Sequence, residues 1–228
     1  MPRRARVRIG NIPWHVLQRG NNRQRCFYGA DDCAFYLRQL SQLSRQFDCA
    51  VHAYVLMTNH VHLLLTPRDA QGVSMLMKNL GQRVVQRANR IHGRTGSLWE
   101  GRFRSSLIES GRYLFNTYRY IELNPVRAAM ARHPRDYPWS SFRVNAEGIA
   151  SRLIQPHEEY LRLGATPDER QGAYRDLFGT ELEAPELELI RARTNGGFVI
   201  GGEAFCRRIG TETGRRVDPL TRGRKPGK

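Results

Sequence analysis

Short runs of hydrophobic residues, each closed by turn-forming residues, predict strands in the first half of the chain. The first run stops at Gly20-Asn21-Asn22, and two later runs are separated only by Thr58 and Asn59. We expect strands at Trp14–Arg19, Val51–Met57 and His60–Thr66, and either a strand or an extended loop at Ser97–Glu109.

Apolar residues that recur three or four positions apart predict three helices between and after these strands. Asp31 and Asp32 are candidate N-caps of the first, because a side-chain oxygen there can accept a backbone N–H. The helices are expected from Asp31 to about Phe47, from Gly72 to about His92, and from near Gly111 toward Leu123. This order of strands and helices is typical of an α+β fold, in which helices flank a mainly antiparallel sheet.

The character of the chain changes after about residue 150. Tyr137-Pro138-Trp139-Ser140-Ser141 resembles a closing turn, and short helical pieces then alternate with Gly and Pro. We expect these pieces at Pro167–Phe178, Pro185–Arg193 and Gly202–Ile209. The pattern predicts one domain at residues 1–149 and a mostly helical, basic extension at 150–228 that can take part in DNA binding. Its end, Arg207 to Lys228, has eight basic and two acidic residues and is expected to be partly disordered.

The net charge points to a polyanionic partner. The chain has 37 Lys and Arg against 21 Asp and Glu, which gives +16 and a pI near 10.6. Lys occurs only at positions 78, 225 and 228, so nearly all the basic residues are Arg. Arg binds phosphate with two hydrogen bonds, although a coding bias of the source genome would also produce Arg in place of Lys.

Composition also excludes several classes of protein. No apolar run approaches the ~18 residues that span a bilayer, and the basic start of the chain leads into no apolar secretory signal. The four cysteines form no CxxC pair, so we expect free thiols and not disulfides or a zinc knuckle. We therefore expect a cytoplasmic, nucleoid-associated protein.

His60 and His62 lie two positions apart in a predicted strand, so their side chains share one face of it. Two imidazoles on one face can chelate a divalent ion, but such a pair is more often a packed or surface feature. His52, on the neighbouring predicted strand, either joins this cluster or packs in the core.

Tyr120 and Asn124 lie four positions apart and share a face if their helix continues to Asn124. Pro125 opposes this, because a proline disfavours the α conformation of the residue before it. On spacing alone we favour the alternative, in which Asn124 caps a new helix that begins at Pro125. Tyr120 is then an ordinary half-buried aromatic residue.

The segment Leu98–Arg104 interleaves aromatic residues with arginines. Arg102 and Arg104 can hold phosphates while the face of Trp99 stacks on an unpaired base. The alternative is an amphipathic strand with Trp99 and Phe103 in the core.

These segments occur together in an order that resembles the REP-associated tyrosine transposases, within the single-tyrosine HUH transposases. The resemblance runs from about Pro13 to Phe142, and residues 150–228 contain no motif that we can place. It is carried by His15-Val16, Arg19-Gly20-Asn21-Asn22, Asn59-His60-Val61-His62, Leu98–Phe103, Tyr120–Ala128 and Pro138–Ser141.

The resemblance implies a ferredoxin-like α+β core and an enzyme that cleaves and rejoins single-stranded DNA at palindromic repeats through a 5′-phosphotyrosine. It assigns the nucleophile to Tyr120 and the ligands of a Mg or Mn ion to His60, His62 and Asn124, although the family often has Gln at the last position. Together with the arginine and aromatic pattern, it suggests DNA contacts by Arg19, Asn21, Asn22, Arg23, Trp99, Arg102, Arg104 and Arg127.

The main alternative is a domesticated protein that binds repeat DNA and no longer cuts it. The presence of Tyr120, His60, His62 and Asn124 disfavours that alternative. The sequence contains no RNP or KH signature, which disfavours an RNA-binding protein, and no HExxH motif, which disfavours a zinc hydrolase. We expect single-stranded or hairpin DNA as the partner and no membrane, and assembly into a homodimer stays open.

Overall fold

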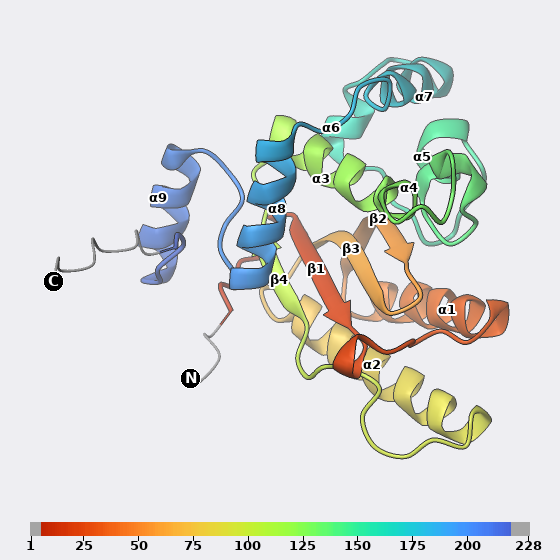
Figure 1. The fold of residues 1–228 in the computed structure, drawn as a ribbon. Coiled ribbons are helices and arrows are strands. Elements are labelled where there is room, and N and C mark those ends of the chain that lie inside the picture. Colours follow the sequence, from red (N-terminus) through yellow and green to blue (C-terminus); the bar gives the residue numbers. More distant parts are fainter. Residues whose placement is uncertain (1–5, 220–228) are drawn as a thin grey trace, which may run out of the picture.

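A computed structural model describes residues 6–219 and shows a four-stranded antiparallel sheet with helices on both faces (Figure 1). The strand order is β2-β3-β1-β4, and all three pairings are antiparallel. The strands are β1 (Trp14–Arg19), β2 (Cys49–Leu56), β3 (His60–Pro67) and β4 (Arg104–Leu107). The expected α+β class, with helices flanking an antiparallel sheet, is confirmed.

The alternation of side chains along β3 separates the two layers of the core. Val61 and Leu63 pack on one face of the sheet, which α1 (Ala30–Gln46) and α2 (Gly72–Ile91) cover. Leu64 belongs to the other layer, under α3 (Arg112–Glu122). Because side chains on a strand alternate, the even-numbered His60 and His62 face α3 with Leu64.

The start of α1 differs from the expectation. Gly29, in an extended conformation, is the N-cap, and Asp31 and Asp32 lie inside the first turn. The capping prediction was therefore wrong. Both carboxylates still complement the positive end of the helix dipole, and Asp32 Oδ2 accepts the backbone N–H of Tyr28 at 2.9 Å.

Pro125 divides the helical segment that carries the candidate tyrosine. α3 ends at Glu122, and α4 (Asn124–Arg127) begins after the single residue Leu123, which keeps a helical conformation. A new helix thus begins here, as the alternative interpretation predicted, but Leu123 and not Asn124 is its N-cap. The chain turns so little at this point that Asn124 stays one helical turn beyond Tyr120.

The C-terminal half adds helices beside this core, and the helical pieces expected there are present. α8 lies next to α3 and contacts β4 and β1 (Figure 1). The remaining helices are the 3-10 turns at Asn21–Arg23 and Pro134–Asp136, α5 (Phe142–Glu147), α6 (Glu158–Leu161), α7 (Pro167–Asp176), α8 (Ala184–Gly196) and α9 (Glu203–Thr213). The basic tail begins within α9, and residues 220–228 lie outside the described residues. The division into a domain and an extension stays a prediction.

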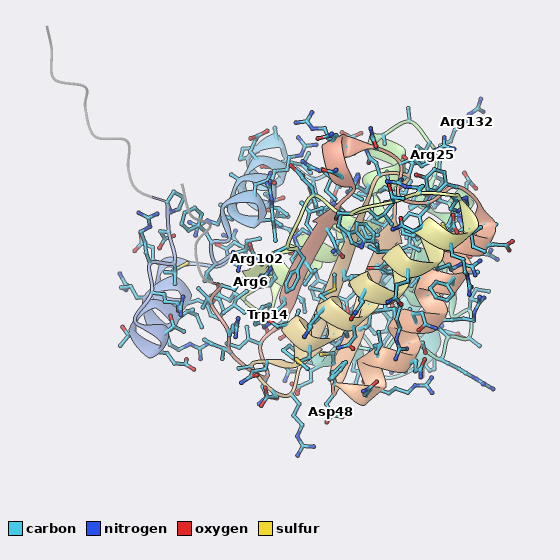
Figure 2. The ribbon with its side chains drawn as sticks, turned by 90° about the horizontal axis from the view of Figure 1, so that it is seen from below. Arg6, Trp14, Arg25, Asp48, Arg102 and Arg132 are labelled. Carbon is cyan, nitrogen blue, oxygen red and sulfur yellow. The ribbon has the colours of Figure 1, made fainter. Side chains whose placement is uncertain are left out.

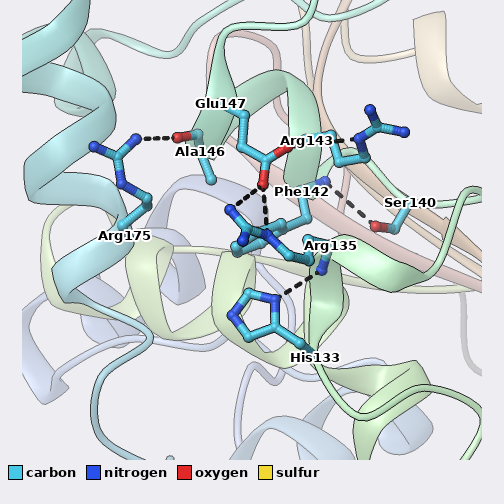
Figure 3. A network of polar contacts seen from close by, with 8 residues as sticks. All are labelled: His133, Arg135, Ser140, Phe142, Arg143, Ala146, Glu147 and Arg175. Atoms are coloured by element: carbon cyan, nitrogen blue, oxygen red, sulfur yellow. Dashed lines mark hydrogen bonds and ion pairs between the residues drawn. The ribbon is translucent and has the colours of Figure 1, made fainter.

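Polar contacts fix the closing turn and α5 against the sheet. The backbone N–H of Leu56 donates to Trp139 O at 2.9 Å, and that of Tyr54 donates to Ser141 Oγ at 2.8 Å. On the outer side, Glu147 accepts from Arg135 Nε at 2.9 Å, and Arg175 donates to the carbonyl of Ala146 (Figure 3).

Two expectations from composition can be compared with the described part of the chain. All four cysteines are buried free thiols. Within residues 6–219, no helix has the length and apolar character needed to cross a bilayer.

A fully buried carboxyl group links α3 to the C-terminal half. Glu122 accepts hydrogen bonds from Ser141 Oγ at 2.5 Å, Asn145 Nδ2 at 2.9 Å and the Tyr174 hydroxyl at 2.8 Å. Burial raises the pKa of Glu122 to about 7, and the three hydrogen bonds oppose that rise.

This carboxyl group makes stability depend on pH. Between about pH 4.5 and 7 it is ionised in the unfolded chain but protonated in the folded one, so the free energy of unfolding falls as pH rises. We expect wild type to lose about 3 kcal/mol across this window relative to Glu122→Gln, at about 1.4 kcal/mol per unit. Urea unfolding of both proteins at several pH values measures the difference. If the free energy of unfolding changed with pH in the same way for wild type and Glu122→Gln, the prediction would be contradicted.

Candidate active site

Three histidines and one tyrosine converge between the sheet and α3. β1 supplies His15 and β3 supplies His60 and His62, while α3 places Tyr120 above them. The ring centroids of His62 and Tyr120 are 5.5 Å apart, and those of His60 and His62 are 5.1 Å apart. The Tyr120 ring also meets His15 edge-on at 5.7 Å. The fold therefore brings the candidate nucleophile against the candidate metal ligands.

Hydrogen bonds hold the Nδ1 atom of both candidate ligands. Asn59 Oδ1 lies 2.7 Å from His60 Nδ1, and His15 Nε2 lies 2.8 Å from His62 Nδ1. Since the Asn59 oxygen can only accept, the proton of His60 is assigned to Nδ1. Both imidazoles thus make these hydrogen bonds through Nδ1.

Both candidate ligands are held neutral at pH 7. Burial, and secondly the nearby Arg19 guanidinium, lower the pKa of His60 to about 4, although a hydrogen bond with Asn124 acts in the opposite direction. Burial also lowers the pKa of His62 well below its ordinary value. A neutral imidazole is the form that binds a metal ion.

His60, His62 and Asn124 together form a donor set that suits a divalent ion. The Asn124 side chain lies close enough to His60 to raise the pKa of that histidine. Within residues 6–219, no three His, Cys, Asp or Glu side chains gather in a metal-binding group, and the third donor of this candidate set is the amide of Asn124. Two imidazoles and one amide oxygen leave positions open for phosphate oxygens.

His52 does not join the cluster. Its Nδ1 lies 2.7 Å from the carbonyl oxygen of Gln155, and its Nε2 lies 2.9 Å from Thr66 Oγ1. Both ring nitrogens are therefore engaged elsewhere, and of the two alternatives for His52 the structure shows packing.

Arg127 places a positive charge on the candidate nucleophile. Its guanidinium carbon lies 4.7 Å from the centre of the Tyr120 ring, and its Nη2 donates to the Tyr120 carbonyl oxygen. Burial lowers the pKa of Arg127 to about 10, so it stays charged at pH 7. Its Nη1 is buried and has no hydrogen-bond partner among the described residues, which leaves a donor for a ligand oxygen.

Arg19 lies beside His60, and two further arginines share a pocket with it. Arg19, Arg102 and Arg104 line one small pocket, where Arg104 Nη1 donates to Asn195 Oδ1 of α8 at 2.6 Å. Next to this pocket, the exposed turn Asn21–Arg23 is tied to the loop before β3, because Asn59 Nδ2 donates to the Arg23 carbonyl oxygen at 3.0 Å. Arg19 and the turn Asn21–Arg23 therefore lie next to the strand end that carries His60, and Arg102 and Arg104 lie in the pocket that Arg19 lines.

Trp99 is placed differently from the other candidate DNA contacts. Trp99 and Phe103 are buried in the layer under α2, as the alternative interpretation predicted, so Trp99 offers no exposed face for stacking. Trp99 instead forms part of the wall of a groove of about 670 Å³ along α2. Arg6 and Arg102, both labelled in Figure 2, also line this groove.

Sequence reasoning missed two residues of the site. His15 entered the analysis only as part of a motif, although alternation along β1 and the neighbouring β3 strand could have placed it next to His62. Thr194 was not considered, and its hydroxyl lies 2.9 Å from His15 Nδ1. Since 179 positions separate these two residues, no local pattern could have connected them.

Comparisons with known proteins place this site in context. A family model described as "Transposase IS200 like" matches residues 9–124. A solved REP-associated tyrosine transposase bound to a REP hairpin is 19% identical, with a TM-score of 0.52, and the match covers 69% of this chain and 93% of that one. A putative transposase from Deinococcus radiodurans R1 is 17% identical, with a TM-score of 0.35, over 59% of this chain and 97% of that one. None of the curated proteins matches. At these identities the structural likeness concerns the fold alone.

Proposed function

Because the chain belongs to the IS200-like transposase family, we propose that it cleaves and rejoins single-stranded DNA through a covalent bond to Tyr120. The observation that carries the proposal is the position of Tyr120, whose ring packs against both His62 and Arg127. A phenol, a cation and a candidate metal-binding pair are thereby adjacent in one site.

Tyr120 is the proposed nucleophile. Its phenolic oxygen forms a bond to the phosphorus, and the bond from phosphorus to the 3′ oxygen breaks. The phenolic proton leaves, and the departing 3′ oxygen takes up a proton, so the products are a 5′-phosphotyrosine and a free 3′-hydroxyl. The Arg127 guanidinium, which lies against the Tyr120 ring, supplies positive charge close to the attacked phosphate. A 3′-hydroxyl can reverse the step and rejoin the strand without a nucleotide cofactor.

His60, His62 and Asn124 are the proposed ligands of a Mg or Mn ion. When bound there, the ion polarises the non-bridging oxygens of the scissile phosphate. The hydrogen bonds that His60 and His62 make through Nδ1 to Asn59 and His15 hold the two imidazoles, and Nε2 is the atom of each that we propose binds the ion. Arg19, Arg102 and Arg104 supply positive charge around the phosphate.

The proposed substrate is single-stranded DNA next to a hairpin. The solved relative of similar fold is bound to a REP hairpin, and the net charge of +16 suits a polyanion. The exposed turn Asn21–Arg23 beside His60 is placed to contact the unpaired strand.

The proposal is tested by incubating the full chain and Mn²⁺ with labelled hairpin oligonucleotides from palindromic repeats. We expect a protein–DNA adduct that survives denaturation and a released strand with a 3′-hydroxyl. Tight binding without any adduct, with Mn²⁺ and with Mg²⁺, would instead favour a non-cleaving repeat-binding protein.

The basic tail gives a separate prediction about binding. Removing residues 220–228, which lie outside the described residues, deletes Arg222, Arg224, Lys225 and Lys228. If all four contact single-stranded DNA, the slope of log K against log salt becomes shallower by roughly 3, at about 0.7 per contact. Binding titrations at several salt concentrations measure the slope, and an unchanged slope contradicts the prediction.

The structure decides where this truncation has to be made. A chain that ends at Phe205 cuts through α9, whose Ile209 is fully buried. Ending the chain after Pro219 leaves α9 complete, so a change in slope then reports the lost charges and not a damaged core.

A further inference from the structure

We propose that Thr194 of α8 is a positioning residue that fixes His62 in its metal-binding form through His15. The inference deepens the proposed function and rests on it, because it concerns how the candidate ligand is held. It connects the C-terminal half of the chain to a site whose other members lie within or just beyond residues 9–124.

The geometry is a buried chain of two hydrogen bonds. Thr194 Oγ1 lies 2.9 Å from His15 Nδ1, and His15 Nε2 lies 2.8 Å from His62 Nδ1. The exposed fractions of Thr194, His15 and His62 are 2%, 0% and 3%, so water does not compete for these bonds. The His15 and His62 rings also stack, with centroids 5.0 Å apart.

Proton counting along this chain assigns a role to the threonine hydroxyl. A 2.8 Å contact between two ring nitrogens needs a proton on one and a lone pair on the other. If His62 is to offer Nε2 to an ion, its proton is on Nδ1, and His15 Nε2 accepts it. His15 then carries its own proton on Nδ1, and Thr194 Oγ1 accepts that proton.

Without an acceptor at position 194 the opposite arrangement is favoured. A buried N–H on His15 Nδ1 would be unsatisfied, so the His15 proton moves to Nε2. His15 then donates to His62 Nδ1, and His62 carries its proton on Nε2. That proton occupies the atom that would bind the ion.

α8 is well anchored for this role. The neighbouring Asn195 accepts from Arg104 at 2.6 Å, and Glu186 accepts from Asn116 of α3 at 2.6 Å. Ile190 is buried against the layer under α3. Contacts of Glu186, Ile190 and Asn195 thus hold α8 in place, and with it the backbone that carries Thr194.

The test uses Thr194→Val, which keeps the side-chain shape and removes the hydroxyl, with Thr194→Ser as the matched control. Nitrogen-15 NMR of the ring nitrogens in metal-free protein reads the proton positions directly. We expect His62 to carry its proton on Nδ1 in wild type and Thr194→Ser, and on Nε2 in Thr194→Val. A His62 proton on Nε2 in wild type overturns the inference. This part of the test uses wild type alone, so it does not depend on whether a variant folds.

Titration with Mn²⁺ alone gives a second measurement. Loss of a group that orients a metal ligand typically weakens metal binding by about 10- to 100-fold, and we expect such a loss in Thr194→Val but not in Thr194→Ser. Unchanged proton positions and unchanged affinity in a folded Thr194→Val protein overturn the inference. If wild type binds Mn²⁺ as expected but never forms a DNA adduct, the proposed function fails while the positioning role stands.

Discussion

Replacing Tyr120 by Phe is expected to abolish the covalent protein–DNA adduct and to leave hairpin binding nearly unchanged. The substitution removes only the phenolic oxygen, while the ring keeps its contacts with His15, His62 and Arg127. Loss of a nucleophile that acts within a larger site typically costs at least about 10³-fold in rate. Gel analysis of the adduct and a binding titration with the same oligonucleotide measure the two effects.

Other tyrosines of α3 provide the control. Tyr118 is fully buried in the layer under α3, and Tyr113 lies near the start of the helix. We expect Tyr113→Phe to form the adduct at the wild-type level. An adduct that survives Tyr120→Phe and maps to Tyr113 or Tyr118 would show that Tyr120 is not the nucleophile.

Cleavage is expected to require a divalent ion and both histidines of β3. His60→Ala and His62→Ala each remove one of the two proposed imidazole ligands, so we expect cleavage to fall below detection in both. Imidazole suits Mn²⁺ better than Mg²⁺, which prefers oxygen ligands. Mn²⁺ should therefore support cleavage at least as well as Mg²⁺ at equal concentration.

The control for the histidine substitutions is His133→Ala, at an exposed position that caps the 3-10 turn Pro134–Asp136. We expect this variant to cleave a bound hairpin at the wild-type rate. Rates at saturating DNA, with each metal and with excess chelator, give the measurement. Full activity of wild type in excess chelator would exclude a catalytic metal ion.

Hydrophobic periodicity predicted most of the fold, because it is a local property of the chain. The strands at Trp14–Arg19 and His60–Thr66 and the helix at Gly72–His92 are present within one or two residues. Alternation along β3 also placed His60 and His62 on one face. Cap residues were less predictable, since the N-caps of α1 and α4 are Gly29 and Leu123 and not the expected aspartates or Asn124.

The centre of the candidate site could be predicted only in part. The family resemblance suggested Tyr120 and the histidine pair, but their contact depends on how α3 lies across the sheet. The burial of Trp99 and the bond from Thr194 to His15 are tertiary features with no local pattern behind them. The roles of the individual residues stay predictions until the variants are measured.

The strand order has a consequence for how the chain folds. β2 and β3 can form a hairpin early, because only three residues separate them, whereas β1 pairs with partners about 50 and 90 positions away, as at Trp14↔Leu65 and Trp14↔Leu107. Contacts between such distant positions form slowly. Until β1 inserts, His62 has no His15 beside it and the edge of β3 is open to pairing with other chains. If β1 inserts slowly, the histidine cluster therefore assembles late. During the same period the exposed edge of β3 makes the partly folded protein prone to aggregate.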